Sequence, residues 1–161
     1  MIVVCDTSPI RSLVHLDRVD LLRLFERVLV PPAVVRELEY STSSLPPLSD
    51  ACRAYVEIEA PTDATLVAQL LRGLQPGESE AIALAVERGI QNALIDDKAA
   101  REHAKRLGLK PVGTLALLVR AKANGLVPQV APLVDDLREN LNFYVSTDLR
   151  DEILRLAGEK R

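Results

Sequence analysis

Short apolar runs separated by helical segments constrain the fold of this chain more than any other feature. Residues 2–5, 28–30 and 93–95 are each three or four residues long, apolar, and followed by Asp or Pro. Runs of this kind are typical of strands buried on both faces of a sheet. Weaker strands are predicted at 55–59, where an alternating pattern indicates a position near a sheet edge, and at 111–113.

Helical patterns occupy the stretches between these runs. Ser8 is predicted to cap the first helix, with Pro9 at its first helical position, and further helices are predicted over 66–74, 78–88, 98–107 and 114–123. Strands that alternate with helices pair in parallel through right-handed crossovers. The sequence therefore predicts a doubly wound α/β sheet of about five short strands flanked by helices, with a helical C-terminal segment.

Length and composition indicate one globular domain. The 161 residues, 48% hydrophobic and 27% charged, predict a single domain over 1–161, with a core over about 2–125 and a helical extension over 126–161. Residues 41–50 are the most loop-like stretch. No apolar run reaches the ~20 residues of a membrane span, and two isolated cysteines predict a reducing, cytoplasmic setting without a membrane.

Charge and aromatic content exclude some classes of nucleic-acid-binding protein. Twenty basic against 23 acidic residues argue against a protein that coats nucleic acid by bulk charge. With 3% aromatic residues and no Trp, a platform of several stacking rings is not expected either. An enzyme that contacts nucleic acid locally is compatible with both observations.

Acidic residues follow the predicted strands. Asp6 ends the first strand, Asp96 and Asp97 follow the fourth, and Glu37 lies near the end of the helix after the second. In doubly wound sheets the ligand site lies beyond the carboxyl ends of the strands. We therefore expect these carboxylates to approach one another.

Glu80 is the most anomalous acid, because the apolar segment Ala81 to Ala85 follows it directly in the same predicted helix. Burying an unpaired carboxylate costs several kcal/mol. Either a cation from another segment or a metal ion is expected to neutralise it. Glu78, two residues earlier, points about 200° away and is predicted to cap the helix N-terminus instead.

Converging carboxylates predict a metal site. Two unit charges at about 4 Å repel by about 4 kcal/mol at an effective dielectric constant of 20. A divalent cation relieves this repulsion, and an all-oxygen ligand set favours Mg²⁺ or Mn²⁺. One or two such ions activate water for attack on a phosphodiester.

Four motifs resemble those of PIN-domain proteins: Val-Val-Cys-Asp-Thr-Ser-Pro, Val-Pro-Pro-Ala-Val-Val-Arg-Glu-Leu, Gly-Glu-Ser-Glu-Ala-Ile-Ala-Leu-Ala and Ala-Leu-Ile-Asp-Asp-Lys-Ala-Ala-Arg. Their order and spacing match over about residues 2–125. The resemblance implies a metal-dependent ribonuclease, many members being VapC-like toxins that act beside a small antitoxin. It implies that the acidic quartet is Asp6, Glu37, Glu80 and Asp97. Ile95 stands where many relatives have Thr, so Asp96 is expected to share the metal with Asp97.

Basic and hydroxyl side chains near these acids are candidates for substrate binding. The helix after Asp97 carries a basic face, and Arg11 lies one turn into the first helix. Thr114 follows the fifth strand, where it either lines the cleft or caps a helix. The predicted substrate-binding residues are Ser8, Arg11, Lys98, Arg101, Lys105 and Thr114.

The sequence supports a metal-dependent endoribonuclease as the first functional hypothesis, with RNA as its substrate. A phosphoryl-accepting receiver-like domain and a non-catalytic PIN-fold module for nucleic-acid binding or assembly are the alternatives. A homodimer is expected, both from the resemblance and from the apolar run 115–119. The segment 126–161 either closes over the site, forms the dimer contact or packs on the core.

Overall fold

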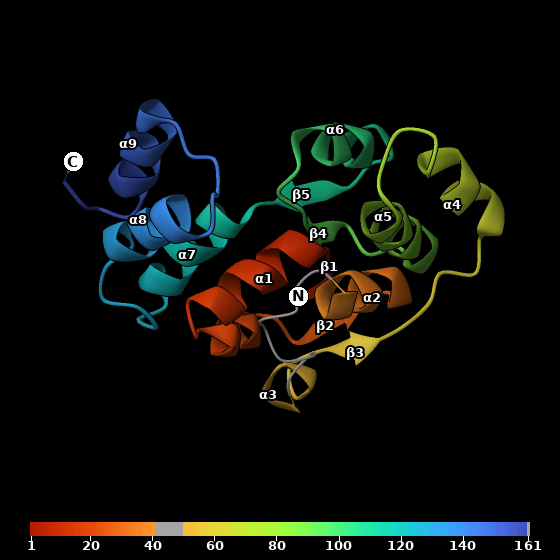
Figure 1. The fold of residues 1–161 in the computed structure, drawn as a ribbon, viewed down its shortest axis with the longest axis horizontal. Coiled ribbons are helices and arrows are strands. Elements are labelled where there is room, and N and C mark those ends of the chain that lie inside the picture. The colour runs from red at the N-terminus through yellow and green to blue at the C-terminus, as the bar shows by residue number, and fades with distance from the viewer. Residues whose placement is uncertain (41–49, 161) are drawn as a thin grey trace.

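Within residues 1–40 and 50–160, which the computed structural model describes, the chain forms a sheet of five parallel strands (Figure 1). Their spatial order is β3-β2-β1-β4-β5, so β1 is central. The predicted α/β class is confirmed. The strands are β1 (Ile2–Cys5), β2 (Arg27–Val30), β3 (Glu57–Ile58), β4 (Asn92–Leu94) and β5 (Lys110–Val112).

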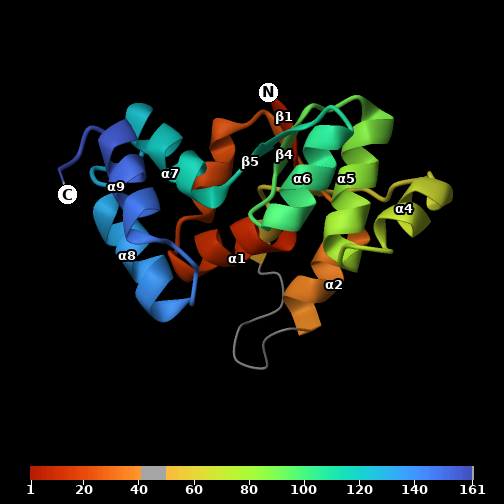
Figure 2. The ribbon, with the colours of Figure 1, turned by 90° about the horizontal axis from the view of Figure 1, so that it is seen from above.

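Helices cover both faces of the sheet, with α1 and α7 on one side and α5 and α6 on the other (Figure 2). The helical C-terminal region, α7 to α9, lies at one end of the molecule (Figure 1). The helices are α1 (Thr7–His15), the 3-10 helix η1 (Val19–Leu24), α2 (Pro32–Tyr40), α3 (Asp50–Arg53), α4 (Ala64–Leu70), α5 (Pro76–Arg88), α6 (Lys98–Arg106), α7 (Thr114–Ala123), α8 (Ala131–Asn140) and α9 (Thr147–Leu156).

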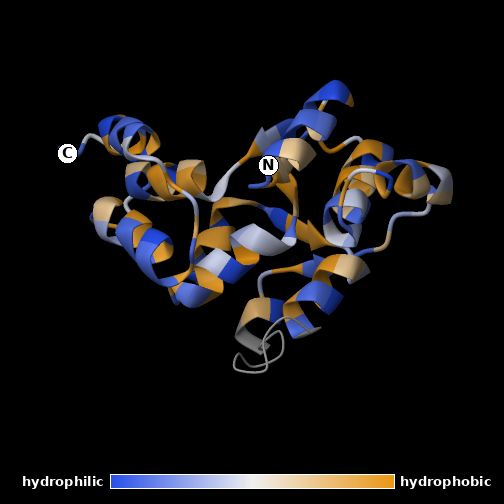
Figure 3. Cartoon of the chain, turned by 45° about the horizontal axis from the view of Figure 1, so that its top comes forward, coloured by the Kyte–Doolittle hydropathy of each residue, from blue (hydrophilic) through white to orange (hydrophobic). Residues whose placement is uncertain are grey.

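The two-residue period of the strands explains why the core has two halves. Val3 and Cys5 join the apolar cluster that contains α1 and α7, whereas Val4 joins the cluster that contains α5 and α6. Successive side chains of a strand point to opposite faces, so an unbroken apolar run serves both clusters. Figure 3 shows the hydrophobic strands at the centre and hydrophilic stretches on the outer helices.

The strand order creates a switch point between β1 and β4. From β1 the chain proceeds to β2 and β3 at one edge, then returns through α4 and α5 to place β4 on the other side of β1. Asp6 N donates to Leu94 O at 3.0 Å, which joins the two strands at their carboxyl ends. Open α/β sheets bind ligands at such a point, and receiver domains have the different order 2-1-3-4-5.

Three helix starts differ from the sequence predictions by a few residues. Asp6, rather than Ser8, occupies the N-cap position of α1, and Pro9 is tolerated in the first turn because N–H groups there have no helical partner. Asp63 accepts from Leu66 N at 3.0 Å and so starts α4 at Ala64. α5 begins at Pro76, two residues before the predicted start. α7 spans the predicted range 114–123, with Gly113 rather than Thr114 at its N-cap position. Of the predicted loop 41–50, residues 41–49 lie outside the described part of the chain.

The apolar run predicted to face a partner is buried inside the chain itself. Leu115, Leu117 and Leu118 belong to the core that α7 shares with α8 and α9. This run therefore gives no physical argument for a dimer, which stays a prediction. In the described ranges, no helix has the length and apolar character needed to cross a membrane.

Glu159 ties the C-terminal helices together, since its carboxylate accepts from Val130 N at 2.6 Å and Ala131 N at 3.0 Å and pairs with Lys122 Nζ at 3.0 Å. We expect Glu159→Ala to lower the free energy of unfolding by about 1–3 kcal/mol, because it leaves these donors without their acceptor. Urea unfolding measures the change. The control is Glu152→Ala, which removes an ion pair with Arg155 on the surface of α9 and should cost much less, because solvent screens exposed ion pairs. Equal losses in the two variants would contradict the account.

Candidate active site

The candidate site centres on Asp6, which immediately follows the central strand. Asp6 is 4% exposed, and its side chain makes no capping hydrogen bond to α1 although it occupies the N-cap position. Its buried Oδ1 has no hydrogen-bond partner among the described residues. A buried carboxylate oxygen without a donor is costly, and this one lies at the switch point of the sheet. The Asp6 side chain therefore does not cap α1, and its Oδ1 is left without a donor among the described residues.

Glu37 lies beside Asp6 in a pocket of about 420 Å³. Two donors from different elements hold its carboxylate: Thr7 Oγ1 donates to Oε2, and Gly77 N donates to Oε1 at 3.1 Å. A Cβ at position 77 would overlap this carboxylate, so Gly77 is required for the close approach of α5 to α2. These contacts fix the Glu37 side chain at the edge of the pocket, where the sequence placed it.

Glu78 also lines this pocket, a placement that the sequence analysis did not predict. It forms the capping box predicted for it, accepting from Gln75 N at 3.1 Å. Burial raises the pKa of Glu78, and the charges of Asp97 and Glu37 act in the same direction. A signal was available: a helix between parallel strands runs antiparallel to them, so its first turn lies at the edge where the strands end.

Glu80, by contrast, is not brought to the pocket around Asp6. Its Oε1 accepts from Ala33 N in the first turn of α2 at 3.0 Å, and its Oε2 lies 3.5 Å from Arg36 Nη2. Of the two predicted ways to neutralise this carboxylate, the structure shows the cation from another segment. The 200° between Glu78 and Glu80 on α5 thus separates a side chain facing Asp6 from one facing α2.

Asp96 and Asp97, which follow β4, have different surroundings. Asp96 Oδ2 accepts from Ser8 Oγ at 2.8 Å and Thr114 Oγ1 at 2.7 Å, and its Oδ1 accepts from Thr114 N at 2.7 Å. Asp97 is exposed and caps α6 through Ala100 N at 3.0 Å. Ser8 and the fully buried Thr114 therefore orient Asp96, and Thr114 lies out of reach of solvent.

The predicted substrate-binding cations fall into two groups. Arg11 and Lys98 line a second pocket, of about 520 Å³, which also contains Ser8, Asp96 and Asp97. The Arg101 guanidinium donates to Ile95 O at 3.0 Å, so it is bound to the backbone just after β4. Lys105 lies 3.9 Å from Glu102 on the surface of α6. The two pockets share Ser8 and Arg11, so the structure brings Arg11 and Lys98, but not the other two cations, to the site.

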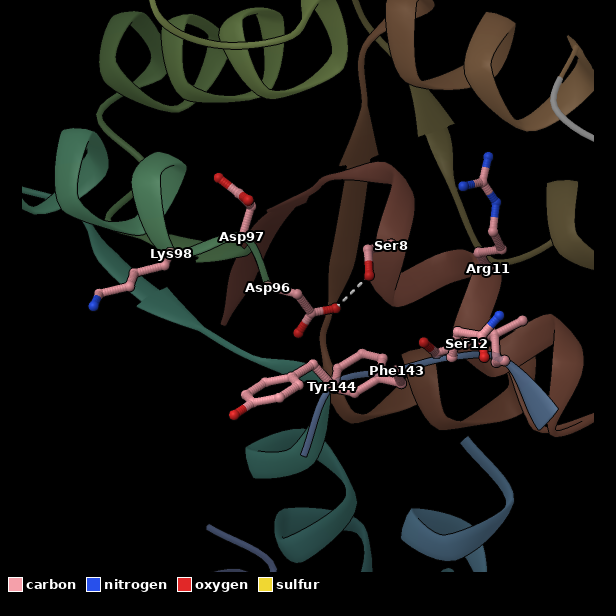
Figure 4. Close-up of a pocket in the computed structure, with 10 residues that line it drawn as sticks. Ser8, Arg11, Ser12, Asp96, Asp97, Lys98, Phe143 and Tyr144 are labelled. Carbon is pink, nitrogen blue, oxygen red and sulfur yellow. Dashed lines mark hydrogen bonds between the residues drawn. The ribbon is translucent and has the colours of Figure 1, made fainter. Parts of the chain in front are cut away.

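The second pocket is completed by the segment after α8. Figure 4 shows Phe143 and Tyr144 on the opposite side of Asp96 from Asp97. The C-terminal extension thus packs against α7 in the core, and its segment after α8 also reaches the site. The sequence left these possibilities open, and the aromatic pair was not recognised as part of the site.

The electrostatics of the site depend on the burial of Asp6. Burial raises the pKa of the Asp6 carboxyl from 3.8 to about 7, and the charges of Glu78, Glu37 and Asp96 act in the same direction, against the backbone N–H of Thr7. Cys5, the residue before Asp6, is buried, and burial raises the pKa of its thiol. The charges of Asp6 and Asp96 raise this pKa further. Among the described residues, the pocket around Asp6 therefore gathers three carboxyl groups, those of Asp6, Glu37 and Glu78, with Arg11 as the one cation in its lining.

The side chains of this region have the chemistry of a hard-cation site. Carboxylates favour Mg²⁺ or Mn²⁺, and the partnerless Asp6 Oδ1 offers such an ion a buried ligand. Over residues 1–40 and 50–160, no three acidic, His or Cys side chains converge closely enough to enclose an ion. Glu37, Glu78 and Asp97 are instead held by the hydroxyl and N–H donors described above.

The family model DUF3368, described as a PIN domain, matches residues 2–159. The match extends the resemblance of the four motifs through the C-terminal helices and supports a nuclease-type fold. No curated protein and no solved structure matches the chain.

The raised pKa of Asp6 predicts how stability depends on pH without divalent cations. A carboxyl that binds its proton more tightly when folded stabilises the fold fully below pH 3.8, and this contribution is lost as pH rises towards 7. The shift corresponds to a loss on the order of 4 kcal/mol. In EDTA, Asp6→Asn should remove this loss and be more stable than the parent at pH 8. Urea unfolding from pH 4 to 8 measures both proteins, and parallel curves would show that Asp6 does not titrate in this way.

Proposed function

Because the chain belongs to the PIN-domain family, we propose that it is a metal-dependent endoribonuclease that hydrolyses RNA phosphodiesters. We further propose that it acts as the toxin of a toxin–antitoxin pair, with a small antitoxin protein as its partner. The observation that carries the nuclease proposal is Asp6, a buried carboxylate at the switch point with an oxygen that no described residue satisfies. Glu37 and Glu78 line the same pocket.

The donor chemistry of the carboxylates fits Mg²⁺ or Mn²⁺, one or two ions, although their side chains would have to turn towards the ion to enclose it. Asp6, Glu37, Glu78 and Asp97 would hold the metal, with Glu78 in the place that the sequence gave to Glu80. When bound, the ion supplies the positive charge that polarises a phosphodiester and makes water more acidic.

The remaining residues of the site position the ligands and the substrate. Thr7 and Gly77 orient Glu37, and Ser8 and Thr114 orient Asp96. Asp96 thus joins the starts of α1 and α7 at the end of β4 and, in this proposal, is not the main ligand. In this proposal Arg11 and Lys98, on the walls of the second pocket, bind phosphates on either side of the cleaved bond.

A specific observation favours a second candidate function, that of a non-catalytic PIN-fold module which binds nucleic acid. Glu37 and Asp96 each accept hydrogen bonds on both carboxylate oxygens, so the present arrangement is satisfied without further ligands at these two residues. Such a module would bind RNA with Arg11 and Lys98 but would not hydrolyse it. RNA cleavage distinguishes the two functions.

The nuclease proposal predicts cleavage of single-stranded RNA in Mn²⁺ or Mg²⁺, loss of cleavage in EDTA, and a decrease of several orders of magnitude in Asp6→Asn, because this carboxylate is the buried ligand. Gel analysis of a labelled RNA measures the products. RNA binding without cleavage by the parent protein in either metal would favour the non-catalytic module.

Glu78 and Glu80 provide a matched pair on one helix. We expect Glu78→Gln to lower the cleavage rate and the thermal stabilisation by Mn²⁺, because a ligand charge is removed. Glu80→Gln should leave both unchanged and lower stability by about 1 kcal/mol, because it weakens the cap on α2 and the pair with Arg36. Thermal melts with and without Mn²⁺, run beside the cleavage assay, measure the two effects. The reverse pattern would return the ligand role to Glu80.

A further inference from the structure

We propose that Tyr144 forms a stacking surface for one base of single-stranded RNA beside the acidic site. This inference rests on the proposed function, because it names how that site holds its substrate. It assigns a substrate-binding role to the segment between α8 and α9. The observations that carry it are the exposure of Tyr144, the anchoring of its neighbours and the charges of the pocket that it borders.

Tyr144 is 85% exposed although both residues beside it are packed inward. Phe143 packs against the apolar core, and Val145 is buried. A segment anchored on both sides holds the ring outside the core, so little backbone conformational entropy remains to be lost when a ligand covers the ring.

The backbone also fixes this segment. Asn142 has a φ of 54°, a left-handed conformation that Asn adopts more readily than most residues. Phe143 N donates to Leu137 O at 3.1 Å, which turns the chain back against the end of α8. Tyr144 is thereby directed towards the pocket instead of continuing the helix.

The pocket beside the ring has the features of a nucleotide site. Its volume is about 520 Å³, and Ser8, Arg11, Lys98 and Tyr144 contribute to its lining. In Figure 4 the Tyr144 ring lies across Asp96 from Asp97, and Lys98 is drawn beside Asp97. The two cations suit phosphates, and the ring suits the flat face of a base. The pocket shares Ser8 and Arg11 with the pocket of Asp6, so a base on Tyr144 places its phosphate near the carboxylates.

The chemistry favours RNA over a protein segment as the occupant. Apolar side chains, Leu141 and Phe143, form only part of this pocket, and the rest of its lining includes cations, carboxylates, two serine hydroxyls and the exposed Tyr144 ring. Cations beside an exposed ring suit a nucleotide, whose phosphate and base they can both contact. One ring also agrees with the low aromatic content of the chain, since a single base needs a single stacking partner. The expected ligand is therefore unpaired, because a paired base cannot expose its face to the ring.

The test measures binding to a single-stranded uridine decamer and to an abasic ribose-phosphate decamer of the same charge. Measurements use fluorescence anisotropy with the full chain in EDTA, so that no cleavage occurs. We expect the parent to bind the uridine decamer about 5- to 100-fold more tightly than the abasic one, the range that stacking of one base contributes. Tyr144→Ala should lose this difference, and Tyr144→Phe should keep it.

Two controls separate stacking from other effects. Leu156→Ala removes another large exposed side chain of the C-terminal helices, 56% exposed on α9, and should keep the preference for bases. Lys98→Gln should lower affinity for both decamers alike and reduce the salt slope by about 1, whereas Tyr144→Ala should leave that slope unchanged.

The outcomes distinguish this inference from the nuclease proposal. The inference is overturned if Tyr144→Ala keeps the preference for bases or if the parent protein shows no such preference. Either result would be expected if the ring instead bound a protein partner. If the parent shows the Tyr144-dependent preference but cleaves no RNA in Mn²⁺, the nuclease proposal fails and the stacking site stands.

Discussion

The burial of the Asp6 carboxyl at the end of the central strand is the constraint on which the rest of the site depends. The parallel strands β1, β4 and β5 are far apart in the sequence but end at one edge of the sheet. Asp6 lies at this edge, where β1 and β4 meet. Burial shifts its protonation towards neutral pH, and neighbouring carboxylates shift it in the same direction. A fold that keeps a carboxylate oxygen with no hydrogen-bond partner among the described residues at its centre gives up stability there. In the proposed function, a hard cation binds this oxygen.

The surrounding side chains show how such a concentration of negative charge is kept in a stable fold. Each neighbouring carboxylate is held by hydroxyl or N–H donors, and the donors come from α1, α5, α6 and α7 as well as from the loops between elements. These contacts separate charges that would repel by about 4 kcal/mol per pair at about 4 Å and an effective dielectric constant of 20. The same contacts join the helices to the sheet edge, so the positions of Glu37 and Asp96 are part of the packing of the core. The cations Arg11 and Lys98 line the neighbouring pocket, where their charges partly offset those of Asp96 and Asp97.

The strands and the class of fold could be predicted from the sequence because both depend on short apolar runs. These runs are apolar throughout because both faces of the sheet are buried. The sequence also predicted that Asp6, Glu37, Asp96 and Asp97 would follow the strands, since topology brings the ends of parallel strands together. The choice of Glu80 over Glu78 depended on an apolar local environment, which could not show that Ala33 and Arg36 of another helix satisfy Glu80. Tyr144 was missed for a related reason. Its place beside Asp96 is set by the packing of α8 on the core and by the turn at Asn142, and no local pattern encodes either distance.

The most direct test of the account is where a divalent cation binds. Crystals soaked in Mn²⁺ give an anomalous signal that locates the ion independently of any assay of activity. The account predicts the strongest peak against Asp6 Oδ1, with the Glu37, Glu78 or Asp97 carboxylate turned towards it. A strongest peak at the acidic surface formed by Asp148, Asp151 and Glu152 on α9, with none at Asp6, would contradict the assignment of this edge of the sheet as a metal centre.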